Sequence, residues 1–312
     1  MPIKEIIKAK AYELGFSDIG FANFEVLDYE IEKYNEWLAN KYNASMEYLE
    51  RNVDKRYDIS LLLDNAKTVI VTATNYFQEK QYSNDDKRGK IARYALGDDY
   101  HTVIKNLQKE LINQIRQYYP EANFLNYIDT GPILERQWAV RSGVGWQGKN
   151  GNVISKKIGS WFFIGIIITD IEFEPDKRMR DYCGTCTKCI EECPTDAIVS
   201  PKVVDANKCI SYWTIEAKPD LKIPDEITEA NPNWMFGCDI CQEVCPWNKK
   251  HEQAIILKDF LARKNENEID LKEILNMTKE DYAIRFKNSA IKRAKLESIQ
   301  RNANSILKKK IR

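Results

Sequence analysis

The segment CGTCTKCIEECP, residues 183–194, places four cysteines within eleven positions of a 312-residue chain. Their spacing is C-x2-C-x2-C-x3-C, and Pro194 follows directly. The chain starts with a charged amphipathic segment rather than a signal peptide. Its longest apolar run, WFFIGIIIT at 161–169, is too short for a membrane span, which takes roughly 20 residues. We therefore expect a cytoplasmic protein without a membrane segment, whose clustered cysteines bind metal rather than form disulfides.

A second cysteine set lies downstream and ends in C-x2-C-x3-C-P, like the first, with 28 residues between its leading cysteine, Cys209, and the rest. The first set has the spacing of bacterial ferredoxins, in which the fourth cysteine binds the neighbouring cluster. This resemblance implies one [4Fe–4S] cluster on Cys183, Cys186, Cys189 and Cys245, and another on Cys209, Cys238, Cys241 and Cys193. Two structural zinc sites are the alternative, although zinc ligands usually come as separated pairs.

Three domains are expected from the patterns along the chain. Helical periodicity at 3–15, 28–52, 99–118 and 132–143 alternates with β-branched runs at 67–77, 123–129 and 161–169. Residues 1–175 are therefore predicted to form an α/β (α+β) domain, in which 78–90 is a loop and Pro132 opens a helix. Residues 176–250 hold all eight cysteines and are predicted to form a ferredoxin-like domain. Residues 251–312 are predicted to be helical and basic.

The C-terminal charge is uneven although the formal net charge of the chain is zero. Residues 285–312 contain one acid, Glu297, and ten basic residues. These are Arg285, Lys287, Lys292, Arg293, Lys295, Arg301, Lys308, Lys309, Lys310 and Arg312. The stretch is either a contact for a polyanion or a solvated helix face with a frayed end.

Asp129 is the best catalytic candidate outside the cysteines. It ends a predicted strand before a predicted helix, where a partly desolvated carboxyl could donate a proton. A helix N-cap is the alternative role for this residue. The two histidines, His101 and His251, are expected to be structural. GVGWQG at 143–148 is not read as a nucleotide-binding loop, because it follows a helix rather than a strand.

The chain resembles the epoxyqueuosine reductases, cobalamin-dependent iron–sulfur enzymes of queuosine biosynthesis, over roughly residues 1–305. Besides the cysteine segment, the matching stretches are DKR at 54–56, YALGDDYH at 94–101, YIDTGPILERQWAVRSGVGWQGKN at 127–150, IGSWFFIGIIITD at 158–170, SYWTIE at 211–216 and FGCDICQEVCPWNK at 236–249. The match is specific because the cysteine spacing and the segment around Asp129 occur together.

The resemblance implies reduction of the epoxide of epoxyqueuosine in a tRNA anticodon loop to queuosine, the last step of queuosine biosynthesis. It implies two [4Fe–4S] clusters and a base-off cobalamin, with Asp129 as a proton donor whose pKa partial burial would raise. The absence of a D-x-H-x-x-G signature agrees with a cobalamin that has no histidine on cobalt. Contacts to cobalamin are implied at Arg56, Val153, Ile164, Ser211, Met235 and Phe236, with simple packing at Ala92. Strand core is the alternative for Val153 and Ile164, and a surface ion pair is the alternative for Arg56.

The expected partners follow from the same resemblance. They are the anticodon stem-loop of the queuosine tRNAs and an unidentified electron donor such as a flavodoxin or ferredoxin, with the protein a monomer. Only the first piece of a HEAT-like helical repeat is recognised, around 298–310, so the basic stretch 285–312 is expected to contact phosphates. A cobalamin-dependent reductive dehalogenase and a two-cluster electron-transfer protein are the competing readings.

Overall fold

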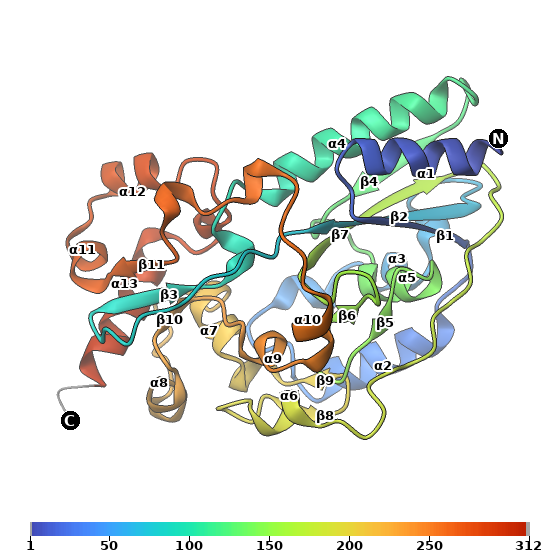
Figure 1. Ribbon diagram of the computed structural model, residues 1–312. Coiled ribbons are helices and arrows are strands. Elements are labelled where there is room, and N and C mark those ends of the chain that lie inside the picture. The colour runs from blue at the N-terminus through green and yellow to red at the C-terminus, as the bar shows by residue number, and fades with distance from the viewer. Residues whose placement is uncertain (1, 310–312) are drawn as a thin grey trace.

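A four-stranded sheet forms the centre of the N-terminal part in the computed structural model, which describes residues 2–309 (Figure 1). Its strands, in spatial order, are β1 (Asp18–Asn23), β2 (Thr68–Asn75), β7 (Phe162–Thr169) and β4 (Phe124–Tyr127). Every neighbouring pair is antiparallel. The predicted strands and the mixed α/β class are confirmed, but the sheet does not have the parallel order of a doubly wound fold.

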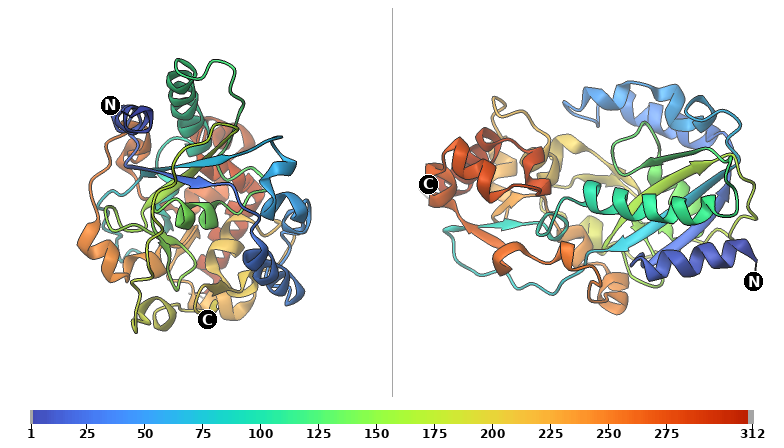
Figure 2. Two further views of the ribbon diagram at one scale, coloured as in Figure 1. Left: turned by 90° about the vertical axis from the view of Figure 1, so that its right-hand side faces the viewer. Right: turned by 90° about the horizontal axis from the view of Figure 1, so that it is seen from above.

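Helices cover both faces of this sheet. Helices α1 (Ile3–Glu13) and α4 (Tyr100–Arg116) lie on one face, and α5 (Glu135–Arg141) lies on the other, as the views in Figure 2 show. Ile70 and Ile167 point toward the first layer, whereas Val71 and Ile166 belong to the core on the side of α5. Burial on both faces explains why β2 and β7 are continuous apolar runs rather than alternating ones. Helices α2 (Asp28–Ala39) and α3 (Val53–Tyr57) connect β1 to β2.

A second sheet joins distant parts of the chain. It consists of β10 (Trp234–Phe236), β3 (Arg88–Ile91) and β11 (Glu268–Asp270), with β3 in the middle. The prediction of a loop over 78–90 is therefore wrong at its end, because β3 becomes a strand by pairing with segments about 145 and 180 residues later. Helices α11 (Leu271–Asn276), α12 (Lys279–Arg285) and α13 (Leu296–Lys308) pack beside this sheet and confirm the helical C-terminal part (Figure 1).

The cysteine-rich segment is built from short elements. These are α6 (Lys188–Glu191), β8 (Ile198–Ser200), β9 (Val203–Val204), α7 (Ile210–Ile215), α8 (Asp225–Ala230), α9 (Ile240–Glu243) and α10 (Pro246–His251). The hairpin of β5 (Trp146–Gln147) and β6 (Val153–Ile154) contains the GVGWQG segment, which confirms that no helix follows these glycines. None of the helices within residues 2–309 is both long and apolar enough to cross a bilayer.

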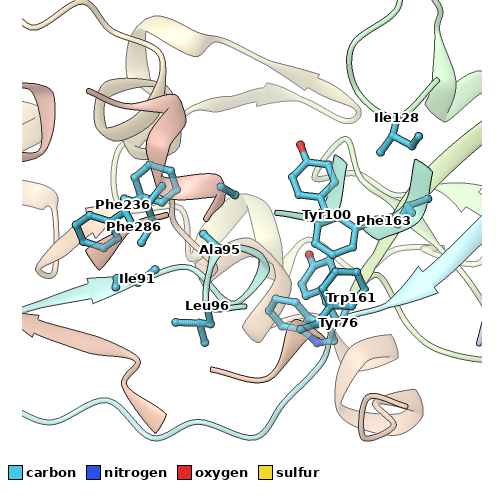
Figure 3. Packing of buried hydrophobic residues seen from close by; sticks show 14 of the residues in the cluster. Tyr76, Ile91, Ala95, Leu96, Tyr100, Ile128, Trp161, Phe163, Phe236 and Phe286 are labelled. Atoms are coloured by element: carbon cyan, nitrogen blue, oxygen red, sulfur yellow. The ribbon is translucent and has the colours of Figure 1, made fainter. Parts of the chain in front are cut away.

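An aromatic column links the sheet to the start of α4 (Figure 3). The ring of Tyr100 stacks on Phe163 of β7, with centroids 4.3 Å apart and planes 6° apart. The ring of Tyr76 packs against the rings of Phe163 and Trp161, with centroid distances of 4.6 Å and 6.1 Å, respectively. The packing fixes the position of the Tyr100 hydroxyl, which matters for the site described next.

Candidate active site

Asp129 lies in a turn between β4 and α5 and has a left-handed backbone, with φ of +55°. The N-cap of α5 is Leu134, which makes no side-chain capping bond. Asp129 is therefore not a helix cap, and the alternative role weighed for it is excluded. Pro132 also lies in this turn, three residues before the helix begins, so the prediction that it opens the helix is wrong. The residues between β4 and α5 form a turn, and Asp129 is exposed in this turn.

Two side chains hold Asp129 in this turn. The hydroxyl of Tyr100 donates a hydrogen bond of 2.7 Å to Oδ2 of Asp129. The main-chain N–H of Asp129 donates a hydrogen bond of 2.7 Å to Oε1 of Glu135, in the first turn of α5. Gly131 allows the turn to fold over Tyr127, because a Cβ at that position would lie 2.4 Å from the Tyr127 ring.

The charge of Asp129 and local burial together raise the pKa values of its two hydrogen-bond partners, Glu135 and Tyr100. Asp129 is exposed as a residue, not partly buried as expected, although its Oδ2 accepts the hydrogen bond from Tyr100. Burial, followed by the charge of Asp129, raises the pKa of Glu135 to about 8. Burial and the same charge also raise the pKa of Tyr100 far above its ordinary value, so its hydroxyl remains a donor at any physiological pH.

Tyr48 and Arg293, which are far apart in the sequence, both lie near Asp129. The charge of Asp129 contributes to the raised pKa of Tyr48 and of Arg293, although burial and Glu216, respectively, are the larger causes. Arg293 pairs with Glu216 at 2.9 Å and lies 5.7 Å from the Tyr48 ring. The site is therefore bordered by the segment before α3 and by the C-terminal part.

Arg56, in α3, is buried beside this border. Its Nη2 donates to the main-chain oxygen of Tyr48 at 3.1 Å, and its guanidinium lies over the Tyr34 ring. The Nε atom is buried and has no hydrogen-bond partner, and no carboxylate pairs with Arg56 among residues 2–309. The surface ion pair weighed for this residue is excluded. An unpaired buried donor at a site border fits a ligand that brings a hydrogen-bond acceptor.

The other residues proposed as cobalamin contacts differ in how exposed they are. Ile164 and Ser211 are partly exposed. Val153, Met235 and Phe236 are buried as whole residues, and the main-chain oxygens of Met235 and Phe236 already accept hydrogen bonds from Asn302 and Ala92. Ala92 is also buried, and its N–H bonds to the Phe236 oxygen at 2.8 Å.

The eight cysteines are free thiols that fall into two electrostatic groups. Burial, then Cys183 and Cys245, raises the pKa of Cys189 to about 11. Burial, then Cys209 and Cys193, raises the pKa of Cys241 above its ordinary range. Cys245 therefore acts on a cysteine of the first set and Cys193 on a cysteine of the second, although Cys189 also contributes to the raised pKa of Cys241.

The cysteine groups are more open than a site for one ion. No three His, Cys, Asp or Glu side chains within residues 2–309 converge closely enough to hold a single metal. A single zinc would draw four sulfurs to about 2.3 Å from itself, whereas a four-iron cluster spreads its ligands over the corners of a cube.

The comparison with known proteins decides the family. The family model described as "4Fe-4S double cluster binding domain" matches residues 182–248, and the model "Epoxyqueuosine reductase QueG, DUF1730" matches residues 56–130. The epoxyqueuosine reductase of Atelocyanobacterium thalassa is 40% identical over 309 residues, covering 98% of this chain and all of the relative. The chain belongs to the epoxyqueuosine reductase family, a family of oxidoreductases.

Solved structures of this family have the same fold. An epoxyqueuosine reductase crystallised with an epoxyqueuosine-modified tRNA-Tyr stem loop is 29% identical, with a TM-score of 0.88, covering 98% of this chain and 80% of that chain. The enzyme from Bacillus subtilis, at 28% identity, has the same TM-score, covering 98% of this chain and 81% of that chain. In that structure the aspartate-bearing catalytic loop is swung out of the active site.

Sequence reasoning missed two members of the site, Tyr100 and Glu135. Tyr100 is contributed by the helix after YALGDD, and no local pattern indicates that its hydroxyl meets a residue 29 positions later. Glu135 could have been predicted, because a second carboxyl six residues after a candidate acid suggests two interacting carboxyl groups with different pKa values. His101 remains structural in this geometry, with its Nδ1 2.7 Å from Oδ1 of Asp99 and its ring stacked on Tyr100.

The basic C-terminal stretch divides into structural and exposed residues. Arg285 pairs with Glu266 and Glu273, and Arg301 donates to main-chain oxygens that include those of Trp213 and Lys218. The exposed members within the described residues are Lys287, Lys292, Arg293, Lys295 and Lys308. Lys310 and Arg312 lie outside the described residues. Arg285 and Arg301 therefore stabilise the fold, and the exposed basic residues are the ones available to contact a polyanion.

Proposed function

We propose that this protein reduces the epoxide of epoxyqueuosine in a tRNA anticodon loop to the alkene of queuosine. The observation that carries the proposal is Asp129, presented by a dedicated turn at the border of the site and bound by Tyr100 and Glu135. Family membership supports the reaction, and the relative bound to a modified tRNA-Tyr stem loop supports the substrate. With the predicted domain boundaries at residues 175 and 250, Asp129 would belong to the first domain and the electron supply to the second.

The reaction consumes two electrons and two protons, breaks both C–O bonds of the epoxide, forms a C=C bond and releases water. Electrons and a nucleophilic metal centre are the chemistry that the bound clusters and a base-off cobalamin supply. Asp129 delivers a proton to the leaving oxygen, and Tyr100 orients the carboxyl through its hydrogen bond to Oδ2. Because Asp129 is exposed in the chain alone, the bound substrate must provide the desolvation that makes the carboxyl a proton donor at neutral pH.

The residues present fit both cofactors. Cys183, Cys186, Cys189 and Cys245 would hold one [4Fe–4S] cluster, and Cys209, Cys238, Cys241 and Cys193 would hold the other. The effects of Cys183 and Cys245 on the pKa of Cys189, and of Cys209 and Cys193 on that of Cys241, support this division. Arg56, with its unpaired Nε, would hold a cobalamin side-chain amide or phosphate oxygen. Ile164 and Ser211 would line the same pocket, with the buried residues Val153, Met235 and Phe236 packed behind them.

The tRNA would cross the C-terminal part on its way to Asp129. Lys279, Lys292 and Lys295 line an open groove of about 320 Å³, and Arg293 reaches from this region toward the site. Exposed lysines at this spacing suit the phosphates of an anticodon stem. We propose a monomer that receives electrons from a small donor such as a flavodoxin or ferredoxin, at the face of the cysteine domain.

Two measurements test this proposal. Protein reconstituted without oxygen, with cobalamin and a strong reductant, should convert epoxyqueuosine in tRNA from cells lacking the activity, seen by mass as the loss of one oxygen atom. Cobalamin titration should show that Arg56→Met weakens binding about 10-fold relative to wild type. Conversion without cobalamin, or equal cobalamin affinity in the variant, would contradict the assigned cofactor or its contact.

A further inference from the structure

The turn that carries Asp129 needs support, because a left-handed backbone is unfavourable for a residue with a Cβ. Asp129 has φ of +55° and its side chain is exposed, so no core packing holds it in place. The Tyr100 hydrogen bond fixes its carboxylate but not its main chain. The main chain is held by the bond from the Asp129 N–H to Oε1 of Glu135, at 2.7 Å.

Glu135 is well suited to hold this turn because it belongs to a rigid element. Helix α5 buries Trp138 and Ala139 completely between β6 and the sheet. The carboxyl of Glu135 reaches back from the first turn of this helix across six residues. Its side chain therefore ties the Asp129 turn to the helix, while its backbone is part of the helix.

The charge state of Glu135 also suits a neighbour of a catalytic carboxyl. Burial, and then the charge of Asp129, raises its pKa to about 8, so the group is mostly uncharged at pH 7. A neutral carboxyl still accepts the main-chain hydrogen bond through Oε1. It does so without adding a second negative charge beside Asp129 when the substrate arrives.

We infer that Glu135 is a positioning residue that holds the Asp129 turn over the site by accepting the hydrogen bond from the Asp129 main-chain N–H. The inference rests on the proposed function, in which Asp129 donates the proton. It assigns to Glu135 no contact with the substrate. The acceptor oxygen, and not the ability to ionise, is the property that the turn requires.

The test uses the reconstituted full-length protein with Glu135→Ala, Glu135→Gln and, as a matched control, Glu110→Ala on the exposed face of α4. Amide hydrogen exchange of the peptide covering 127–134 reports on the turn independently of turnover. Steady-state kinetics on epoxyqueuosine tRNA report on kcat and KM. Alanine is a good helix former at the start of α5, so the fold should tolerate it.

Glu135→Ala should speed exchange of the Asp129 amide and lower kcat, each about 10-fold, with little change in KM. Glu135→Gln retains an acceptor oxygen and should stay within about threefold of wild type in both measurements. Unchanged exchange in Glu135→Ala would overturn the inference, as would a Gln variant as impaired as the Ala variant. If fully loaded wild type does not convert epoxyqueuosine, the proposed function fails, and if Asp129→Asn turns over as fast as wild type, Asp129 is not the proton donor. In either case the exchange measurement still decides whether Glu135 holds the turn.

Discussion

The Tyr100 hydroxyl illustrates how one atom can decide the geometry of a site. Its ring is fixed by stacking on Phe163, and its oxygen lies 2.7 Å from Oδ2 of Asp129. A hydrogen bond to a charged partner contributes about 1.5–3 kcal/mol. Tyr100→Phe should therefore lower kcat about 10- to 100-fold. Steady-state kinetics beside Tyr118→Phe, which alters an exposed tyrosine, would check this, and a kcat equal to wild type would contradict the role of the hydroxyl.

Glu135 makes a further prediction, about stability. Its pKa is raised from 4.5 to about 8 in the folded chain, so between these values the folded state binds more protons than the unfolded state. Its contribution to stability is therefore complete below about pH 4.5 and is lost as the pH rises through about 8. Urea denaturation should show that the free energy of unfolding of wild type falls relative to Glu135→Gln between pH 5 and pH 8.5. A difference that stays constant over this range would show that the carboxyl ionises normally.

At the scale of residues, the sequence predicted the members of the site that belong to local motifs. The cysteines and Asp129 were found from spacing and from the strand–turn pattern. Tyr100 and Glu135 were not found, because the hydrogen bonds that recruit them depend on how α4, β4 and α5 meet in space. The outward exposure of Asp129 was also missed, since burial is a property of the whole chain rather than of a motif.

The short elements of the cysteine segment bring thiols that are distant in the sequence near one another. Cys183 and Cys245 act on the pKa of Cys189 in α6, whereas Cys209 and Cys193 have the largest charge effects on Cys241 in α9. Arg93 fixes this arrangement to the sheet, because its guanidinium pairs with Asp239 at 3.1 Å and with Glu243 at 2.6 Å.

The exchanged pairing predicts a pattern among serine variants. Cys193→Ser and Cys209→Ser should lose the same cluster and leave the same residual electron paramagnetic resonance signal. Cys245→Ser and Cys186→Ser should leave the other signal, because these two cysteines belong to the first cluster. Each variant should retain about half of the wild-type iron. If Cys193→Ser gives the signal of Cys186→Ser, the pairing follows sequence order and the exchanged assignment is wrong.

Elements were predicted well where hydrophobic patterns are local and long. The strands β2 and β7 and the helices α1 and α4 are confirmed, since each has a continuous pattern of its own. Strand β3 was taken for a loop, because it is stabilised by pairing with β10 and β11 far along the chain. The antiparallel order of the main sheet was not predicted either, because alternation of helices and strands does not fix strand direction.

The whole molecule places the C-terminal part and the Asp129 turn on one site, and this arrangement predicts how tRNA binding depends on salt. The double variant Lys292→Ala with Lys295→Ala should weaken tRNA binding and reduce the slope of log affinity against log salt by about two. Both lysines line the open groove and are exposed. The matched control is Lys105→Ala with Lys109→Ala on the exposed face of α4. An unchanged slope in the groove variant would contradict the phosphate contacts.

The proton donor is the central claim, and the most direct test compares wild type with Asp129→Asn at equal iron and cobalt content. Both proteins receive epoxyqueuosine-containing tRNA, cobalamin and a strong reductant without oxygen, and the nucleosides are analysed by mass. The account predicts that wild type converts epoxyqueuosine to queuosine, with the loss of one oxygen atom, and that the variant is slower by at least about 100-fold. Equal conversion by both proteins would contradict Asp129 as the donor, and no conversion by fully loaded wild type would contradict the assigned substrate.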